Sequence, residues 1–339
     1  MNKTTWAVAV GTAASLLVVG AEAGPVLDAV KARGQLICGV PGPTVGFASE
    51  VNGKYVGLDV DVCRAAAVAL LGDAAKVKFV PLQADKRLPS LKAGEVDLLV
   101  SNSTLTVSRA ADAGFDFLAV YFYDGQGMLV PRKLNKFKIE DLNGASICVA
   151  GNTTSERNLA NYFKANKLTY KPVILAKVED VRATFFGGKC DVYTADAAQL
   201  YAARAAYASN PNEYMVLPKL ISKEPLAQIV RDGDAAFARI VRWSFLAMVE
   251  AEEKRVSSKN VDDMLKSEDD NIKRLLGVTP GIGKALGVDE KWVYNIVKQV
   301  GNYGEVFDRN LGAASQLKVS RGQNALWSEG GMQYAPPFQ

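Results

Sequence analysis

Short apolar runs that end in glycine occur twice in the chain. Residues 36–42 read Leu-Ile-Cys-Gly-Val-Pro-Gly, and residues 146–151 read Ser-Ile-Cys-Val-Ala-Gly. Each run predicts a strand that enters a loop. A second pattern, the end of a helix, a glycine stop and a buried strand, occurs at residues 91–102 and again at residues 185–196. The chain therefore carries a weak internal duplication.

Helical patterns lie between these predicted strands. Asp59 or Asp61 is expected to cap a helix that stops at Gly72, and Ser155 and Glu156 open another. Strands that alternate with helices predict an α/β fold of two similar lobes, each a mostly parallel sheet flanked by helices. Such sheets bind ligands beyond the carboxyl ends of their strands. We expect a cleft there, formed by the stretches around Phe47, 101–104, 151–154 and Asp196.

The remaining parts of the chain are an N-terminal leader and a helical C-terminal third. Lys3, the apolar run 6–19 and Ala21-Glu22-Ala23 predict a cleaved signal peptide over residues 1–23. The alternative is a membrane anchor, but the run is shorter than the roughly 20 residues that a spanning helix needs. Residues 237–249 repeat at helical spacing and predict a core helix. Residues 301–339 are expected to form an ordered tail packed on the first lobe.

Composition narrows the chemistry of this 339-residue chain. The net charge of +4 is too small to indicate nucleic acid as a partner. Histidine is absent, which excludes Ser/His and Cys/His nucleophile pairs and argues against a metal site. The four cysteines allow three pairings, of which we favour Cys38–Cys63 and Cys148–Cys190 because each closes within one half of the chain. Buried free thiols are the alternative.

Two charged residues suit the recognition of a free amino acid. Arg109 follows a run of hydroxyl and amide side chains, residues 101–108, and its planar fork matches a carboxylate. Asp196 ends a predicted strand, where a buried carboxylate suits an ammonium group. Taken alone, Arg109 could be a loop cation and Asp196 a helix cap. Thr153 and Thr154 begin a helix, where they could bind an anion or serve as ordinary caps.

Several segments together carry a family resemblance. The chain resembles the periplasmic amino-acid-binding proteins of ABC transporters, and within them the general L-amino acid-binding subgroup. The resemblance covers the whole mature chain and rests on six segments: 57–64, the helix-Gly-x-x-Asp strand that leads to Arg109, 123–127, 190–196, 221–226 and 300–307. It implies the type II periplasmic-binding-protein fold, with a hinge of two crossing segments near 121–125 and 222–226.

The resemblance also implies a role for each matching residue. Arg109 would hold the α-carboxylate and Asp196 the ammonium group, and Arg87 would bind a side-chain carboxylate. The other implied ligand-binding residues are Asn102, Thr104, Thr153, Thr154 and Phe47, the last as a pocket aromatic. Asn152 departs from the family, which usually has glycine at this turn, so the backbone there is expected to shift. Leu88 and Leu105 stand where aromatics are common, which leaves side-chain specificity open.

The implied organisation is a signal peptide (1–23), a first lobe (24–122), a second lobe (123–223), and a return to the first lobe with the tail (224–339). The implied protein is a periplasmic monomer without a cofactor that delivers L-amino acids, polar, acidic or of broad range, to the membrane permease of an ABC transporter. The alternatives are a dehydratase-like enzyme on the same scaffold and an amino-acid sensor module. An enzyme would need a general acid over the ligand, and no carboxylate except Asp196 is expected in the cleft.

Overall fold

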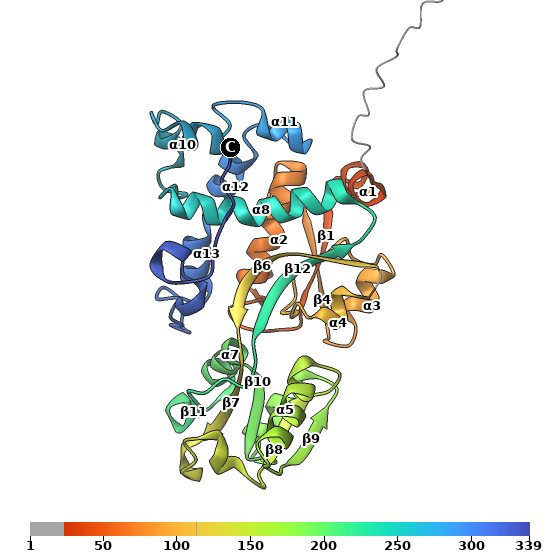
Figure 1. The fold of residues 1–339 in the computed structure, drawn as a ribbon, viewed down its shortest axis with the longest axis vertical. Helices are drawn as coiled ribbons and strands as arrows, with labels where there is room; N and C mark the ends of the chain where they lie inside the picture. The colour runs from red at the N-terminus through yellow and green to blue at the C-terminus, as the bar shows by residue number, and fades with distance from the viewer. Residues whose placement is uncertain (1–23, 113) are drawn as a thin grey trace, which may run out of the picture.

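The computed structural model describes residues 24–112 and 114–339. The predicted signal peptide, residues 1–23, lies outside the described residues. Two lobes lie one above the other and are joined by the strands that run between them (Figure 1). Among the described helices, none is both long enough and apolar enough to cross a bilayer.

Each lobe is built on a five-stranded sheet. The first has the order β4-β1-β5-β12-β6, with β1 (Leu36–Pro41), β4 (Val77–Leu82), β5 (Leu98–Leu99), β6 (Phe115–Asp124) and β12 (Glu224–Arg231). The second has the order β11-β7-β10-β8-β9, with β7 (Gln126–Pro131), β8 (Ser146–Ala150), β9 (Lys171–Leu175), β10 (Val192–Asp196) and β11 (Tyr214–Val216). One strand in each sheet, β12 or β7, pairs antiparallel with both neighbours, so the other four run one way.

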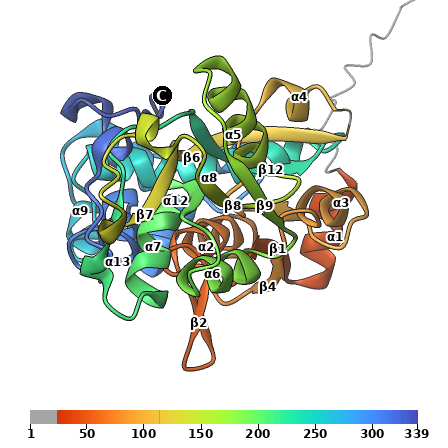
Figure 2. The same cartoon turned by 90° about the horizontal axis from the view of Figure 1, so that it is seen from below.

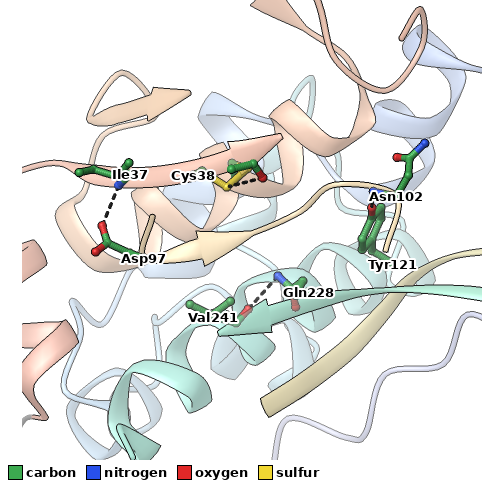
Figure 3. The surroundings of a disulfide bond; sticks show 9 residues. Ile37, Cys38, Asp97, Asn102, Tyr121, Gln228 and Val241 are labelled. Atoms are coloured by element: carbon green, nitrogen blue, oxygen red, sulfur yellow. Dashed lines mark hydrogen bonds between the residues drawn. A yellow bond between two sulfur atoms is a disulfide. The ribbon is translucent and has the colours of Figure 1, made fainter. Parts of the chain in front are cut away.

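The predicted duplication is present in this topology. The strand β1 takes the same place in the first sheet as β8 in the second, and β5 the same place as β10. Asp97, just before β5, accepts a hydrogen bond from the backbone N–H of Ile37 at 2.8 Å (Figure 3). Asp191, just before β10, does the same with the N–H of Ser146 at 2.8 Å. Each aspartate therefore accepts the backbone N–H of the residue opposite it and fixes the register at the start of the central strand pair.

Helices cover the sheets of both lobes. Those of the first lobe and the tail are α1 (Pro25–Arg33), α2 (Leu58–Leu71), α3 (Arg87–Lys92), α4 (Val107–Ala110), α8 (Ala235–Glu253), α9 (Val261–Met264), α10 (Asp270–Leu275), α11 (Ile282–Leu286), α12 (Trp292–Gln299) and α13 (Tyr303–Asn310). Those of the second lobe are α5 (Thr154–Ala165), α6 (Val178–Phe186) and α7 (Ala197–Tyr207). A hairpin of β2 (Ser49–Val51) and β3 (Lys54–Val56) projects from the body (Figure 2). Short 3-10 turns lie at Arg132–Leu134, Ile139–Leu142, Pro211–Glu213, Gly322–Asn324 and Trp327–Glu329.

The predicted disulfides are present, and the predicted cap of α2 is not. Cys38 on β1 is bonded to Cys63 on α2, and Cys148 on β8 is bonded to Cys190 before β10, so each bridge lies within one lobe. The N-cap of α2 is Gly57, not Asp59 or Asp61. Gly57 has φ 137°, and a Cβ there would lie 2.0 Å from the carbonyl oxygen of Phe47. Only glycine fits this approach, so the aspartates fall inside the helix.

The chain crosses between the sheets at Gly125 and returns between β11 and β12. The two crossing segments are held together, because the N–H of Ile221 donates to the carbonyl of Gln126 at 2.9 Å. A Cβ on Gly125 would lie 2.8 Å from the carbonyl oxygen of Ser222, so a side chain there would force the segments apart.

The C-terminal tail packs on the first lobe, as predicted. The hydroxyl of Tyr303 donates to the carbonyl of Tyr121 on β6 at 3.0 Å. Asn324 makes two bonds to the backbone of Tyr123: its Oδ1 accepts from the N–H at 2.7 Å, and its Nδ2 donates to the carbonyl at 2.9 Å. Because β6 is an edge strand, Asn324 supplies the pairing that a further strand would otherwise give.

Candidate functional site

A cavity of about 480 Å³ is lined by residues of both lobes. Its first-lobe walls come from α3, the loop after β5, and α4. Its second-lobe walls come from the start of α5 and the end of β10. Seven of the eight predicted site residues line it together: Arg87, Asn102, Thr104, Arg109, Thr153, Thr154 and Asp196. The volume is in the range of small-molecule sites.

Phe47, the eighth predicted residue, does not line this cavity. Its side chain is fully buried in the first-lobe core. The ring contacts Phe122 edge-on, with the ring centroids 5.4 Å apart. The prediction that Phe47 is a pocket aromatic is therefore wrong, because its ring packs against the sheet and not into the cleft.

Arg109 is fixed from the loop that precedes it. The hydroxyl of Thr106 caps α4 by accepting the N–H of Arg109 at 3.3 Å. The Nη1 of Arg109 donates to the carbonyl of Thr104 at 2.8 Å. Burial, followed by the nearby guanidinium of Arg157, lowers the pKa of Arg109. The result is an oriented, partly desolvated cation on the wall of the cavity, which suits a planar anion.

Asp196 lies at the opposite side of the cleft, at the junction of β10 and α7. It holds the N-cap position of α7, yet its side chain makes no capping hydrogen bond. Its exposed fraction is 5%. Burial, followed by the neighbouring charges of Asp124 and Glu224, raises the pKa of Asp196 well above its ordinary value. A buried carboxylate of this kind is stabilised when a cation binds beside it.

Glu224, at the start of β12, is a central residue that the sequence did not single out. Its Oε2 accepts from the hydroxyls of Thr104 and Thr154, the latter at 3.1 Å. Its Oε1 accepts from Asn158 Nδ2 at 2.7 Å and from the hydroxyl of Ser222 at 2.6 Å. Four donors from both lobes therefore meet on one carboxylate that is 1% exposed. The only signal in the sequence was its place in the 221–226 segment.

A second carboxyl, Asp124, lies close to this point. Its oxygens accept from the N–H groups of Gly125 at 2.8 Å and Ala198 at 3.1 Å. Burial raises the pKa of Asp124 to about 7, although these two hydrogen bonds act to lower it. The charge of Glu224 adds to the rise. Asp124, Asp196 and Glu224 thus concentrate negative charge at the hinge end of the cavity.

The two threonines at the start of α5 have different roles. Thr153 is the N-cap, accepting the N–H of Glu156 at 3.2 Å, and it donates to the carbonyl of Ala150 at 2.7 Å. Thr154 faces Glu224 instead. Asn152 before them adopts φ 59°, a left-handed conformation that asparagine tolerates. The residue therefore adopts a backbone conformation that glycine also reaches readily.

Arg87 lies on the first-lobe wall with a buried acid behind it. Its Nη1 donates to the carbonyl of Asn102 at 3.2 Å, and the N–H of Asn102 bonds to the hydroxyl of Tyr121 at 3.1 Å (Figure 3). Asp59 is completely buried near these groups. Burial raises the pKa of Asp59 to about 8, although Tyr121 and Arg87 act to lower it. Arg87 is thereby held by neighbours and faces the cavity.

The lobes also touch at the outer edge of the cleft. Arg182 on α6 donates through Nη1 to the carbonyl of Pro43 at 3.0 Å. Gln83 Nε2 donates to Glu179 Oε2 at 3.3 Å. Together with the bond between Thr154 and Glu224, these contacts bring the two halves of the candidate site within reach of one small ligand.

Comparison with known proteins identifies the family. Residues 36–267 match the bacterial extracellular solute-binding proteins, family 3. The chain belongs to this family. The match agrees with the two lobes, the crossing segments and the cleft between them.

Individual relatives align over most or all of the chain. The chain is 46% identical over 331 residues to the general L-amino acid-binding periplasmic protein AapJ of Rhizobium johnstonii, covering 96% of this chain and 97% of that one. It is 46% identical over 341 residues to the glutamate/glutamine/aspartate/asparagine-binding protein BztA of Rhodobacter capsulatus, covering all of both. A solved periplasmic binding protein of Brucella ovis with glutathione bound is 47% identical, with a TM-score of 0.90, covering 92% of this chain and 99% of that one.

Proposed function

We propose that this protein binds free L-amino acids in the periplasm and delivers them to the permease of an ABC transporter. The observation that carries the proposal is the shared cavity of Arg109, on the first lobe, and Asp196, on the second. An amino acid carries its carboxylate and its ammonium group on one carbon atom, so the two residues can hold one molecule only when the lobes meet around it. The ligand therefore binds the closed state better and shifts the population toward it.

The other lining residues complete the two charged ends. Asn102 and Thr104 would add first-lobe contacts, and Thr153 with Thr154 would cover the carboxylate from the start of α5, where free N–H groups favour an anion. Arg87 would meet the side chain. The polar lining, and the names of the relatives AapJ and BztA, favour acidic, amide or a broad range of side chains. The protein is proposed to act as a monomer, without a cofactor.

A short peptide with an amino-acid end is the second candidate ligand. The Brucella ovis relative holds glutathione. Glutathione has twice the non-hydrogen atoms of glutamate and presents a free α-amino acid at one end. The cavity volume of about 480 Å³ equals roughly 16 water molecules at about 30 Å³ each, which leaves room beyond a single amino acid.

The names of the relatives and the lining of the cavity favour a transport role over a catalytic role for this site. The relatives that align over the whole chain are named as binding proteins. Asp196, whose pKa is raised well above its ordinary value, is placed for an ammonium group and so is not free to protonate a leaving group. The other carboxyl on the cavity wall, Asp85, lies 3.8 Å from the ammonium group of Lys86. A dehydratase activity would be seen as turnover of a bound aromatic precursor, and a sensor role as capture of a receptor in place of a permease.

The test is a thermal-shift screen against the twenty amino acids and glutathione, followed by calorimetry on variants. A true ligand at a hundredfold excess over its Kd stabilises the folded state by about 2.7 kcal/mol. Arg109→Ala should lose roughly a hundredfold in affinity, because it removes one partner of a desolvated charge pair. Arg239→Ala, on the exposed face of α8, is the matched control and should bind as the wild type does. No shift with any compound, or full binding by Arg109→Ala, would overturn the proposal.

A further inference from the structure

The charged residues that line the cavity differ in how well they are provided with partners. Three arginines line it, namely Arg87, Arg109 and Arg157, against two aspartates, Asp85 and Asp196. Asp85 is itself 3.8 Å from the ammonium of Lys86. Glu224 and Asp124 add two further carboxyl groups close to Arg109 and Asp196, so the three arginines differ in how near they lie to a carboxylate.

Arg157 is the cation without a partner. It lies on α5 one turn beyond Thr154, and its guanidinium makes no hydrogen bond or ion pair with any described residue. Arg109, by contrast, donates to Thr104 and faces Glu224 and Asp196, and Arg87 donates to Asn102 and lies near Asp59. Arg157 is exposed, so its charge is hydrated in the empty site and can meet an anionic group of a ligand.

Arg157 and Arg109 come from opposite lobes. They lie close enough for Arg157 to disfavour the charged form of Arg109, second only to burial. Two like charges that approach as the lobes close oppose the closure, and an anionic group between them relieves the repulsion. A ligand with a second carboxylate adds this anion, whereas its neutral amide counterpart does not.

We propose that Arg157 is a specificity-determining residue that favours ligands of net negative charge, such as acidic amino acids or peptides with an additional carboxylate, over neutral amino acids. This inference rests on the proposed function of the cavity. It concerns the choice between ligands and not the grip on the α-amino acid end, which is the task of Arg109 and Asp196.

The test compares glutamate with glutamine, which have nearly the same shape and differ by one charge. Calorimetry gives both Kd values for the wild type, for Arg157→Gln and for Lys164→Gln. Lys164 lies exposed on the same helix, so its variant changes the net charge equally and serves as the matched control. In Arg157→Gln the ratio of glutamate to glutamine affinity should fall about two- to fivefold, as for one exposed charge pair, and Lys164→Gln should keep the wild-type ratio.

Each outcome bears on one claim. An unchanged ratio in Arg157→Gln, or an equal loss for both ligands, would overturn the role of Arg157 while leaving the amino-acid site intact. Binding of neither ligand, nor of any other amino acid, by the wild type would instead overturn the proposed function. Raising the salt concentration should reduce the glutamate preference of the wild type and have little effect in Arg157→Gln. Glutathione should lose affinity in Arg157→Gln as glutamate does.

Discussion

Thr154, on the second lobe, donates a hydrogen bond of 3.1 Å to Glu224, at the point where the chain re-enters the first lobe. The same carboxylate also accepts from Thr104, Ser222 and Asn158. Glu224 thus joins both lobes and the hinge, and it holds two of the three threonines that are proposed to contact the ligand, Thr104 and Thr154. A change at Glu224 should therefore affect both stability and binding.

Glu224→Gln should destabilise the protein by about 1–3 kcal/mol. The amide nitrogen cannot accept, so at least one hydroxyl or amide donor in this buried cluster loses its partner. Chemical denaturation measures the loss. Glu95→Gln, at an exposed position before β5, is the control and should change stability by no more than about 0.5 kcal/mol. Equal stability of the two variants would show that the four bonds contribute nothing net.

Amino-acid affinity should rise with pH until Asp196 is ionised in the empty site. The pKa of Asp196 is raised there by burial and by Asp124 and Glu224, with Arg87 and Arg109 opposing the rise. An ammonium group that binds the carboxylate lowers this pKa, so below it the protein must release a proton to bind. Calorimetry in buffers of different ionisation enthalpy should detect that proton in the wild type as the pH is raised from the ordinary carboxyl pKa of 3.8. Binding without proton release at every pH above this value would contradict the pairing.

Asp196→Asn should weaken amino-acid binding at least tenfold. It should also remove the part of the pH dependence of affinity that comes from titration of the Asp196 carboxyl. The variant keeps the shape of the side chain and loses only its charge. An effect on the α-amino group can be isolated by comparing an amino acid with its N-acetyl derivative. The derivative, which has no ammonium group, should bind the wild type and Asp196→Asn equally poorly.

The stability of the empty protein should fall as pH rises from about 4 to about 8. Asp59 has its pKa raised to about 8 and Asp124 to about 7, so in this window the folded state binds more protons than the unfolded state. Asp59→Asn removes the larger contribution. It should therefore gain stability relative to the wild type between pH 5 and pH 8, by roughly 1–3 kcal/mol. The control Asp263→Asn, at an exposed site on α9, should show the same pH profile as the wild type.

Asn324→Ala should expose the backbone of the crossing strand. The N–H of Tyr123 now donates to the side chain of Asn324 at 2.7 Å, so removing that acceptor should speed the hydrogen exchange of this one amide. The loss of two bonds at a side chain that is 5% exposed should cost about 1–2 kcal/mol. Amides in the sheet of the second lobe should keep their rates, which separates a local effect from general destabilisation.

Local sequence patterns were enough for the central strands and their flanking helices. The runs at 36–42 and 146–151 became β1 and β8, because an apolar strand covered on both faces by helices needs no polar side. The two charged residues of the proposed ligand site could also be predicted from the sequence, because Arg109 and Asp196 stand at the ends of such elements. Each had an equally ordinary local explanation, and only the family resemblance favoured the site.

Residues whose role depends on a distant partner could not be found in this way. In the sequence, Glu224 and Arg157 look like solvated charges. Glu224 receives its four donors, and Arg157 its cationic neighbour Arg109, only when the chain folds and the two lobes approach each other. From the sequence, Phe47 could face either the cleft or the core, and in the structure it lies in the core, where its ring packs against Phe122. Asp59 was a plausible cap until the close approach of Phe47 to Gly57 fixed the start of α2.

The hydrogen bond between Ile221 and Gln126 has a consequence for how the molecule folds. The sheet of the second lobe uses one continuous stretch, from β7 to β11, whereas the first sheet must wait for β12 to pair with β5 and β6. The segments that bracket the inserted lobe are 96 positions apart between Gln126 and Ser222, and closing a flexible loop of that length costs about 4 kcal/mol of chain entropy. A folded second lobe has already brought its two ends together, so it removes most of that cost. The inserted lobe is therefore expected to fold first and to act as the template on which the first lobe completes its sheet.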